Sequence, residues 1–169
     1  MKTSIEIFED AIEWLKENYD TFSFYTERDV VWTVQNHITE DIKKQDLPYK
    51  IYNDFPILPG KRRSLCTDLA ILNKENSIEV AAEFKYEPSH YRRDIWPTKF
   101  PVVFWGKEGV GKDVGRISDF VSSGKAKHAI VCFIDEDGYF RRREPHIGSE
   151  WIDLKTSPNY QVSILYAKI

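Results

Sequence analysis

The sequence predicts an α/β domain in which a mixed sheet is flanked by helices, and three observations lead to this prediction. Two segments with helical spacing of apolar residues open the chain. Three strand-like runs follow, and then one further helix and two more apolar runs. The chain has 169 residues and no low-complexity tract or long linker, so residues 1–169 fit a single domain. The resulting order, αα-βββ-α-ββ, is typical of helices packed on a mixed sheet.

The first two helices are predicted from their apolar stripes. In MKTSIEIFEDAIEWL, the residues at helical spacing are Ile7, Phe8, Ala11, Ile12 and Leu15. The second helix begins at TERDVVWTVQNHITEDIKK, where Thr26 and Asp29 have the spacing of a capping box. Its stripe consists of Val30, Val31, Val34, Ile38 and Ile42.

The strand-like runs are YKIYNDFPIL, SLCTDLAILN and SIEVAAEFKY. The short polar link KENS between the last two predicts that they are antiparallel neighbours. Residues 87–111 are rich in Pro, Gly, aromatic and charged residues and are predicted to be irregular. A helix is expected over DVGRISDFVSS, residues 113–123, and the last two strands over HAIVCFID and YQVSILYAKI.

Three charged residues stand inside the apolar strands, namely Asp68 in CTDLAIL and Glu83 and Lys85 in AAEFKYE. Because strand side chains alternate, Glu83 and Lys85 share one face and Phe84 points to the other. A charge in such a run is costly unless it is paired, solvated or bound to a metal. The pattern therefore leaves two interpretations open, a Mg²⁺ site or a set of solvent-facing or salt-bridged residues.

Glu27 favours the first interpretation. An acidic residue in the first turn of a helix also has a simple explanation, since it interacts favourably with the helix dipole. Glu27, however, lies on the same helical face as Val30, Val31 and Val34, and that face is expected to rest on the sheet. The carboxylate therefore extends an inward-facing stripe toward the charged strand residues.

These residues give the chain a resemblance to the PD-(D/E)xK nuclease superfamily, whose members share a restriction-endonuclease-like αβββαβ core. Asp68 matches the Asp of the motif, Glu83 its second acid and Lys85 its lysine, with 14 residues between the two acids. Glu27 matches the acid of the preceding helix. Thr67 stands where the motif usually has Pro. The resemblance covers roughly residues 20–135 in element order as well as in motif.

The resemblance implies a metal-dependent nuclease that hydrolyses phosphodiester bonds of DNA, as in restriction, repair or defence. Asp68, Glu83, the backbone carbonyl of Phe84 and Glu27 would then hold Mg²⁺, with Mn²⁺ as a substitute. Lys85 would orient or help to deprotonate the attacking water and stabilise charge on the phosphate. The catalytic residues implied are Glu27, Asp68, Glu83 and Lys85.

Basic residues beside aromatic or glycine residues are the expected contacts to the substrate backbone. They are Lys61, Arg62, Arg63, Arg92, Arg93, Lys112 and Arg116. Arg116 has a second interpretation, an ion pair with Asp113 three residues earlier. Residues 1–169 are expected to form one domain with no separate unit for target recognition, so sequence-specific cutting would need residues 87–111, a homodimer or a partner subunit. Three aromatic residues expected to be exposed, and available for such contacts, are Trp96, Phe100 and Trp105.

Residues 106–112 also satisfy G-x-x-x-x-G-K, the beginning of a phosphate-binding P-loop. A P-loop places Ser or Thr after its lysine, whereas this chain has Asp113, a carboxylate beside the phosphates. We therefore expect Asp113 to begin a helix and predict no ATPase.

Composition limits the remaining classes. The net charge is −3, so any site for a polyanion must come from local clusters of basic residues. Cys66 and Cys132 lack the spacing of a zinc site or disulfide framework. The amino terminus is acidic and amphipathic, unlike a signal peptide, and no apolar run approaches the roughly 20 residues of a membrane span. We expect a cytoplasmic protein with no membrane partner.

Two alternatives to a nuclease remain. One is a non-catalytic nucleic-acid-binding or protein-assembly module on the same fold, and the other is a small interaction domain whose acids are structural. The intact Asp, Glu and Lys set favours the nuclease over the first alternative, because a retired site has no reason to keep isolated charges in apolar strands.

Overall fold

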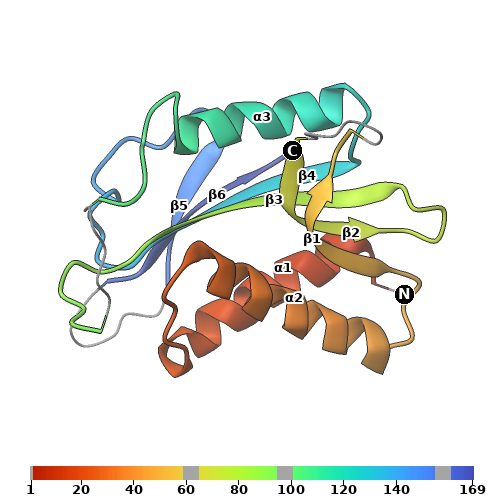
Figure 1. The fold of residues 1–169 in the computed structure, drawn as a ribbon, viewed down its shortest axis with the longest axis horizontal. Helices are drawn as coiled ribbons and strands as arrows, with labels where there is room; N and C mark the ends of the chain where they lie inside the picture. The colour runs from red at the N-terminus through yellow and green to blue at the C-terminus, as the bar shows by residue number, and fades with distance from the viewer. Residues whose placement is uncertain (1, 59–64, 95–100, 155–160) are drawn as a thin grey trace.

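The computed structural model describes residues 2–58, 65–94, 101–154 and 161–169. Within these residues, one sheet of six strands has helices on both faces (Figure 1). The helices are α1 (Ser4–Asn18), the short 3-10 helix η1 (Tyr19–Thr21), α2 (Glu27–Lys44) and α3 (Val110–Ser122). The strands are β1 (Lys50–Pro56), β2 (Cys66–Leu72), β3 (Ile78–Glu87), β4 (His128–Asp135), β5 (Ser149–Asp153) and β6 (Ser163–Lys168).

The sheet is mixed, as predicted, with the strand order β1-β2-β3-β4-β6-β5. The β2–β3 pair is antiparallel, which confirms the prediction from their short link. β3 and β4 are the parallel pair, and α3 forms the crossover between them. The sequence analysis missed β5, whose residues SEWID are short and mixed in polarity and lie at the edge of the sheet.

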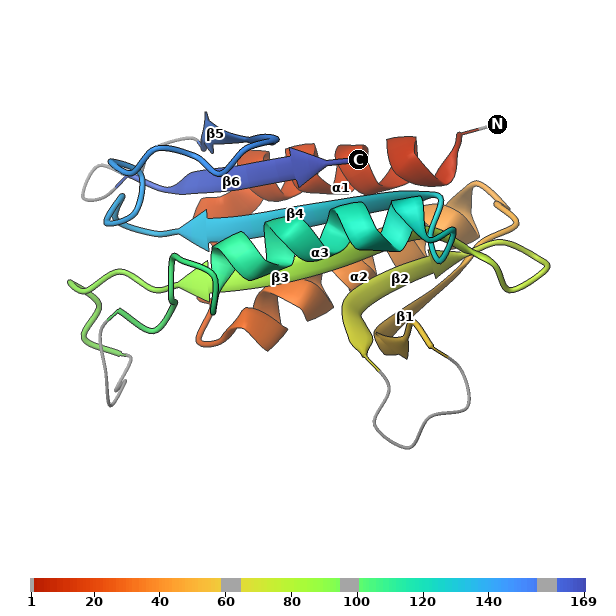
Figure 2. The ribbon, with the colours of Figure 1, turned by 90° about the horizontal axis from the view of Figure 1, so that it is seen from above.

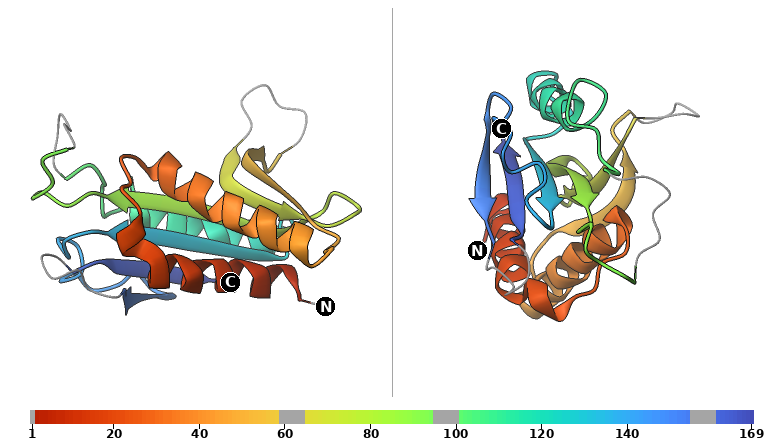
Figure 3. Two further views of the ribbon diagram at one scale, coloured as in Figure 1. Left: turned by 90° about the horizontal axis from the view of Figure 1, so that it is seen from below. Right: turned by 90° about the vertical axis from the view of Figure 1, so that its left-hand side faces the viewer.

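Each face of the sheet has its own apolar core. α1 and α2 cover one face, where Phe8, Val34 and Ile38 pack against residues that include Phe84 (Figure 3). All five residues of the predicted stripe in α1 are buried, and in α2 only Ile42 is partly exposed. α3 covers the opposite face (Figure 2) and buries residues that include Ile117 and Phe120.

The start of α2 fixes the position of Glu27. Thr26 is the N-cap residue, and the Asp29 carboxylate accepts hydrogen bonds from the backbone N–H groups of Tyr25 and Thr26 at 2.9 and 2.7 Å. These bonds satisfy amides that a helix leaves without partners at its N-terminus. The predicted helix start is confirmed, and Glu27 is the first helical residue, on the side of α2 that faces the sheet.

β2 separates from β3 where the charged residues stand (Figure 2). The backbone register between the two strands runs as far as Leu69 opposite Ala82. Beyond that point two side chains of β2 replace the ladder, because Thr67 Oγ1 donates to the Ala82 carbonyl at 2.8 Å and Asp68 Oδ2 accepts from Phe84 N–H at 2.7 Å. The divergence therefore places a carboxylate between two neighbouring strands.

Among the described residues, no helix has the length and apolar character that crossing a membrane requires.

Candidate active site

Lys85 lies at the centre of a charged cluster that three elements form. Its Nζ is 3.2 Å from Glu27 Oε2 of α2 and 3.6 Å from Asp113 Oδ2 of α3, and it donates to the Phe84 carbonyl at 2.7 Å. Burial by itself would lower the pKa of Lys85, but Glu27 and Asp113 raise it more, so its pKa lies above the ordinary value. Lys85 is therefore an ammonium group at neutral pH.

Asp68 meets this cluster from β2. Its Oδ2 bonds to the backbone N–H of Phe84, the residue whose carbonyl accepts from Lys85. Burial raises the pKa of Asp68, and the hydrogen bond from Phe84 and the charge of Lys85 only partly offset that effect. Burial likewise raises the pKa of Glu27, with Lys85 acting in the opposite direction. The structure thus brings Glu27, Asp68 and Lys85 together, as the sequence predicted.

Glu83 lies deeper, beneath α3. Glu83 is 1% exposed, and its Oε2 forms an ion pair with Arg116 Nη2. Burial raises the pKa of Glu83 to about 8, with Asp68 adding to the increase and Arg116 opposing it. Asp68 bonds to the backbone N–H of Phe84, the residue that follows Glu83, so the two acids come from adjacent positions on β2 and β3. Of the residues described, none makes a hydrogen bond to Glu83 Oε1.

Asp113 is a member of the cluster that the sequence analysis assigned only to a helix start. It lies inside the first turn of α3, is 4% exposed, and contacts Arg116 Nη2 at 3.1 Å as well as Lys85. The predicted ion pair of Arg116 with Asp113 is therefore confirmed. A signal for Asp113 was present in the sequence, since it shares a helical face with Val110, Val114 and Ile117.

The cluster holds more acids than cations, and its cations lie between its acids. Lys85 contacts the Phe84 carbonyl that the resemblance gives to Mg²⁺, and Arg116 contacts Glu83. In the part of the chain that the structure describes, no three or more His, Cys, Asp or Glu residues are grouped as a metal site. The buried oxygens Glu83 Oε1 and Asp113 Oδ2 nevertheless lack hydrogen-bond partners there, which leaves them able to accept a further cation.

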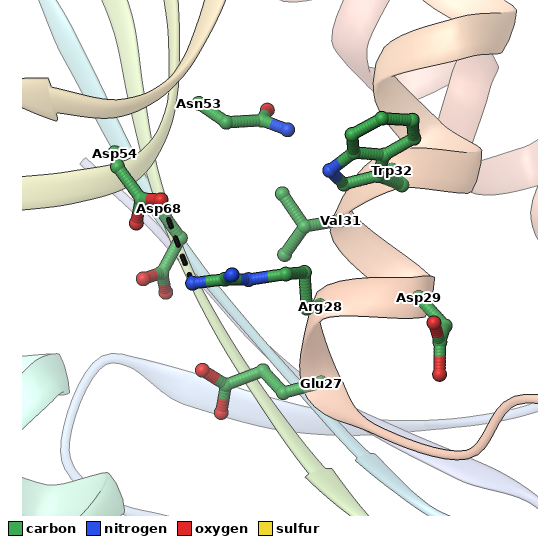
Figure 4. Close-up of a pocket in the computed structure, with 8 residues that line it drawn as sticks. All are labelled: Glu27, Arg28, Asp29, Val31, Trp32, Asn53, Asp54 and Asp68. Carbon is green, nitrogen blue, oxygen red and sulfur yellow. Dashed lines mark ion pairs between the residues drawn. The ribbon is translucent and has the colours of Figure 1, made fainter.

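Two hollows open beside the cluster, and Glu27 lines both of them. We call the first the α2–β1 hollow, about 430 Å³, which is lined by Glu27, Arg28, Asp29, Val31, Trp32, Asn53, Asp54 and Asp68. Figure 4 shows Glu27 and Arg28 reaching from α2 toward Asp68, with Trp32 one turn further along the helix. We call the second the loop hollow, about 480 Å³, whose lining includes Tyr25, Glu27, Lys85 and Phe104.

The predicted substrate-binding residues that the structure describes are Arg92, Arg93, Lys112 and Arg116, and they have different surroundings. Lys61, Arg62 and Arg63 fall outside the described residues. Arg93 and Lys112 are exposed, and Arg116 forms ion pairs with Glu83 and Asp113. Arg92 is half-buried, with 14% of its side chain exposed, and its Nη1 donates to the Phe24 carbonyl and to Tyr86 Oη. Arg92 also pairs with Glu136, so these contacts give it a structural role.

Replacing Arg92 with alanine is expected to lower the free energy of unfolding by about 2 kcal/mol, because a buried carbonyl and the buried Glu136 carboxylate lose a charged donor. Urea denaturation measures the effect. The neighbouring exposed Arg93 is the matched control, and Arg93→Ala is expected to leave stability within about 0.5 kcal/mol of wild type. Equal stability of the two variants would contradict the structural role of Arg92.

The glycine-rich segment before α3 has a packing role in place of a phosphate-binding one. Gly109 lies so close to Phe104 that an added Cβ would be 1.7 Å from the Phe104 carbonyl oxygen. That oxygen accepts from Val110 N–H at 2.9 Å, and the Trp105 carbonyl accepts from Gly111 N–H at 3.1 Å. The first amides of α3 are therefore already bonded, which agrees with the prediction that this is not a P-loop.

Of the aromatic residues expected at a dimer contact, Trp96 and Phe100 lie outside the described residues. The expected exposure of Trp105 is wrong. Its ring is half-buried and stacks on His146 and Trp151 with centroid separations of 4.5 and 5.8 Å. These contacts tie the segment before α3 to β5.

Comparison with known proteins gives no match to a protein-family model and none to a curated protein.

Proposed function

We propose that this chain is a metal-dependent nuclease that hydrolyses phosphodiester bonds of DNA. One observation carries the proposal: Glu27 of α2, Asp68 of β2 and the β3 residues Glu83 and Lys85 come from separate segments of the chain and gather where β2 separates from β3. The element order α2-β1-β2-β3-α3-β4 also agrees with the αβββαβ order that the resemblance implies. A buried cluster of this kind is costly to stability, which favours a functional reason for it.

The donor groups suit Mg²⁺, with Mn²⁺ as a substitute. Carboxylates and a backbone carbonyl are hard oxygen ligands, and the buried Glu83 Oε1 lacks a hydrogen-bond partner among the described residues. Asp68, Glu83, the Phe84 carbonyl and Glu27 would hold the ion, in competition with Lys85 and Arg116 for the same oxygens. When bound, the ion polarises the phosphodiester and lowers the pKa of a water ligand.

Lys85 acts as a cation at this site. Because Glu27 and Asp113 raise its pKa, its ammonium group donates hydrogen bonds at neutral pH and does not accept the proton of a water molecule. It orients the attacking water and stabilises negative charge that develops on the phosphate. Glu27, at 3.2 Å from Lys85 Nζ, holds the ammonium group in position.

The test is a titration of Mg²⁺ or Mn²⁺ with single- and double-stranded DNA, with the Asp68→Ala protein in parallel. Cleavage is expected to depend on the metal, to stop when EDTA removes it, and to be lost in Asp68→Ala. Cleavage by wild type that persists in EDTA, or equal rates for the two proteins, would contradict the proposal.

A second candidate function, a non-catalytic binding or assembly module on this fold, has one observation in its favour. Lys85 and Arg116 already neutralise part of the acidic cluster, as they would in a purely structural ion-pair network. Thermal unfolding distinguishes the metal-dependent nuclease from the structural module. A metal ion that binds only the folded state, present at a concentration 100 times its Kd, adds about 2.7 kcal/mol to the free energy of unfolding. We expect Mg²⁺ to raise the Tm of wild type and not of Asp68→Ala. No shift in either protein would favour the structural module.

The cytoplasmic location and the homodimer or partner subunit expected from the sequence stay predictions.

A further inference from the structure

Exposed aromatic rings stand on both sides of the candidate active site. Trp32, in the α2–β1 hollow, is 57% exposed. In the loop hollow, Tyr25 and Phe104 are 53% and 58% exposed. The two hollows share Glu27, so an extended ligand that occupied both would pass over the Glu27 carboxylate and Lys85. Rings in this position, on both sides of an acidic cluster, are the kind of side chain on which unpaired bases stack.

Arg28 is the cation best placed to accompany the ring of Trp32. The two residues are four positions apart on α2 and therefore lie on one side of the helix. The Arg28 side chain is 76% exposed, and its contact with the equally accessible Asp54 is long, at 3.8 Å. Lys85 and Arg116 are held by buried carboxylates, whereas Arg28 can reach a phosphate without leaving a buried acid unpaired.

From these positions we propose that a single strand of nucleic acid, in place of a duplex, crosses the site with unpaired bases stacked on Trp32 and Phe104. Arg28 contacts the phosphate that lies between the base on Trp32 and the acidic cluster. This inference rests on the proposed nuclease function and names its substrate class, a strand or strand end whose bases are unpaired.

The charge of the hollows favours the single strand over the duplex. Duplex binding depends mainly on cations along the phosphate backbone. The two hollows contain Arg28 and Lys85 but a larger number of acids, among them Asp54, Asp68 and Glu108. Affinity must therefore come from the ring faces, and only unpaired bases present a free face to an aromatic side chain.

The test measures binding without cleavage. A fluorescein-labelled strand of about 12 nucleotides and the matching duplex are titrated with protein by fluorescence anisotropy, with Ca²⁺ in place of Mg²⁺. Wild type is expected to bind the strand more tightly than the duplex. Trp32→Ala and Phe104→Ala are each expected to weaken binding of the strand by roughly 5- to 100-fold. Tyr91→Ala is the matched control, because Tyr91 is 78% exposed and lines neither hollow, and its affinity is expected to equal that of wild type.

The inference is overturned if the duplex binds as tightly as the strand, if neither binds, or if Trp32→Ala and Phe104→Ala match Tyr91→Ala. Failure of the proposed nuclease function gives a different result. A protein that binds the strand through Trp32 but cleaves nothing in Mg²⁺ retains this inference and loses the hydrolytic activity. A protein that cleaves a duplex and ignores the strand keeps the activity and loses this inference.

Discussion

Lys85→Ala is expected to slow the cleavage of DNA by about 10²- to 10³-fold, the range that loss of one group stabilising charge in the transition state costs. Its ammonium group is held at 3.2 Å from Glu27 and 3.6 Å from Asp113, so alanine removes the cation that pairs with both acids. The measurement is the rate of cleavage at saturating Mg²⁺. Under this condition a weaker affinity for the metal does not lower the rate, so a slower rate reports a slower chemical step.

Stability must be followed in the same protein. Removing Lys85 leaves Asp113 with Arg116 as its partner, and Glu27 remains partly exposed at 37%. The loss in the free energy of unfolding should therefore lie between the roughly 1 kcal/mol of an exposed pair and the about 3 kcal/mol of a buried one. Such a loss leaves most native domains folded.

Lys127→Ala is the matched control for Lys85→Ala. Lys127 is 65% exposed and pairs with Glu79 at 3.3 Å, away from the cluster. Its removal is expected to change neither cleavage nor stability by a measurable amount. If Lys85→Ala cleaves DNA as fast as Lys127→Ala, the role given to Lys85 is wrong.

Asp135→Ala is expected to lower the free energy of unfolding by about 3 to 5 kcal/mol. Asp135, at the end of β4, is 0% exposed and accepts from the backbone N–H groups of Tyr139, Phe140 and Arg141 at 3.2, 2.6 and 2.9 Å. Phe140 is itself buried, so its amide would have no water to replace the lost carboxylate. The Asp135 side chain therefore holds three consecutive amides of the segment that follows β4.

Urea denaturation at pH 8 measures this effect. Burial raises the pKa of Asp135 to about 6, although the three N–H groups lower it, so the carboxylate is ionised at pH 8. Asp135→Asn keeps one acceptor oxygen and is expected to lose roughly half as much stability. In the control Asp153→Ala, an exposed carboxylate that pairs with Arg141 is removed, with an expected cost below about 1 kcal/mol. Equal stabilities of Asp135→Ala and Asp153→Ala would contradict the structural role of Asp135.

Much of the fold was predictable because the relevant signals are local. The stripes of α1 and α2, the Thr26 helix start and the β2–β3 pair follow from the spacing of neighbouring residues. β5 was not predictable in this way, since five residues of mixed polarity at a sheet edge carry no clear period. α3 begins at Val110, three residues before the helix start that was predicted from the sequence. The carbonyls of Phe104 and Trp105, which lie outside the helix, accept from its first amides, and spacing within the helix does not show these contacts.

The candidate site was likewise predictable only in part. Periodicity assigned Glu27 to an inward face and Glu83 and Lys85 to one face of a strand, and the contacts agree with both. It could not show that Arg116 pairs with Glu83, since 33 residues separate them. Nor could it distinguish Arg92, which is half-buried and contacts Phe24, Tyr86 and Glu136, from its exposed neighbour Arg93.

The sequence by itself determined the inward faces of α1 and α2 and the order of every strand and α-helix except β5, because short-range spacing records both. Only the tertiary structure decided that β2 leaves β3 at Asp68, that Asp113 joins the cluster from α3, and that the two hollows share Glu27. Each of these features is a contact between elements that are far apart in the sequence. Such contacts depend on how the two cores pack against the sheet, and no local pattern records that packing.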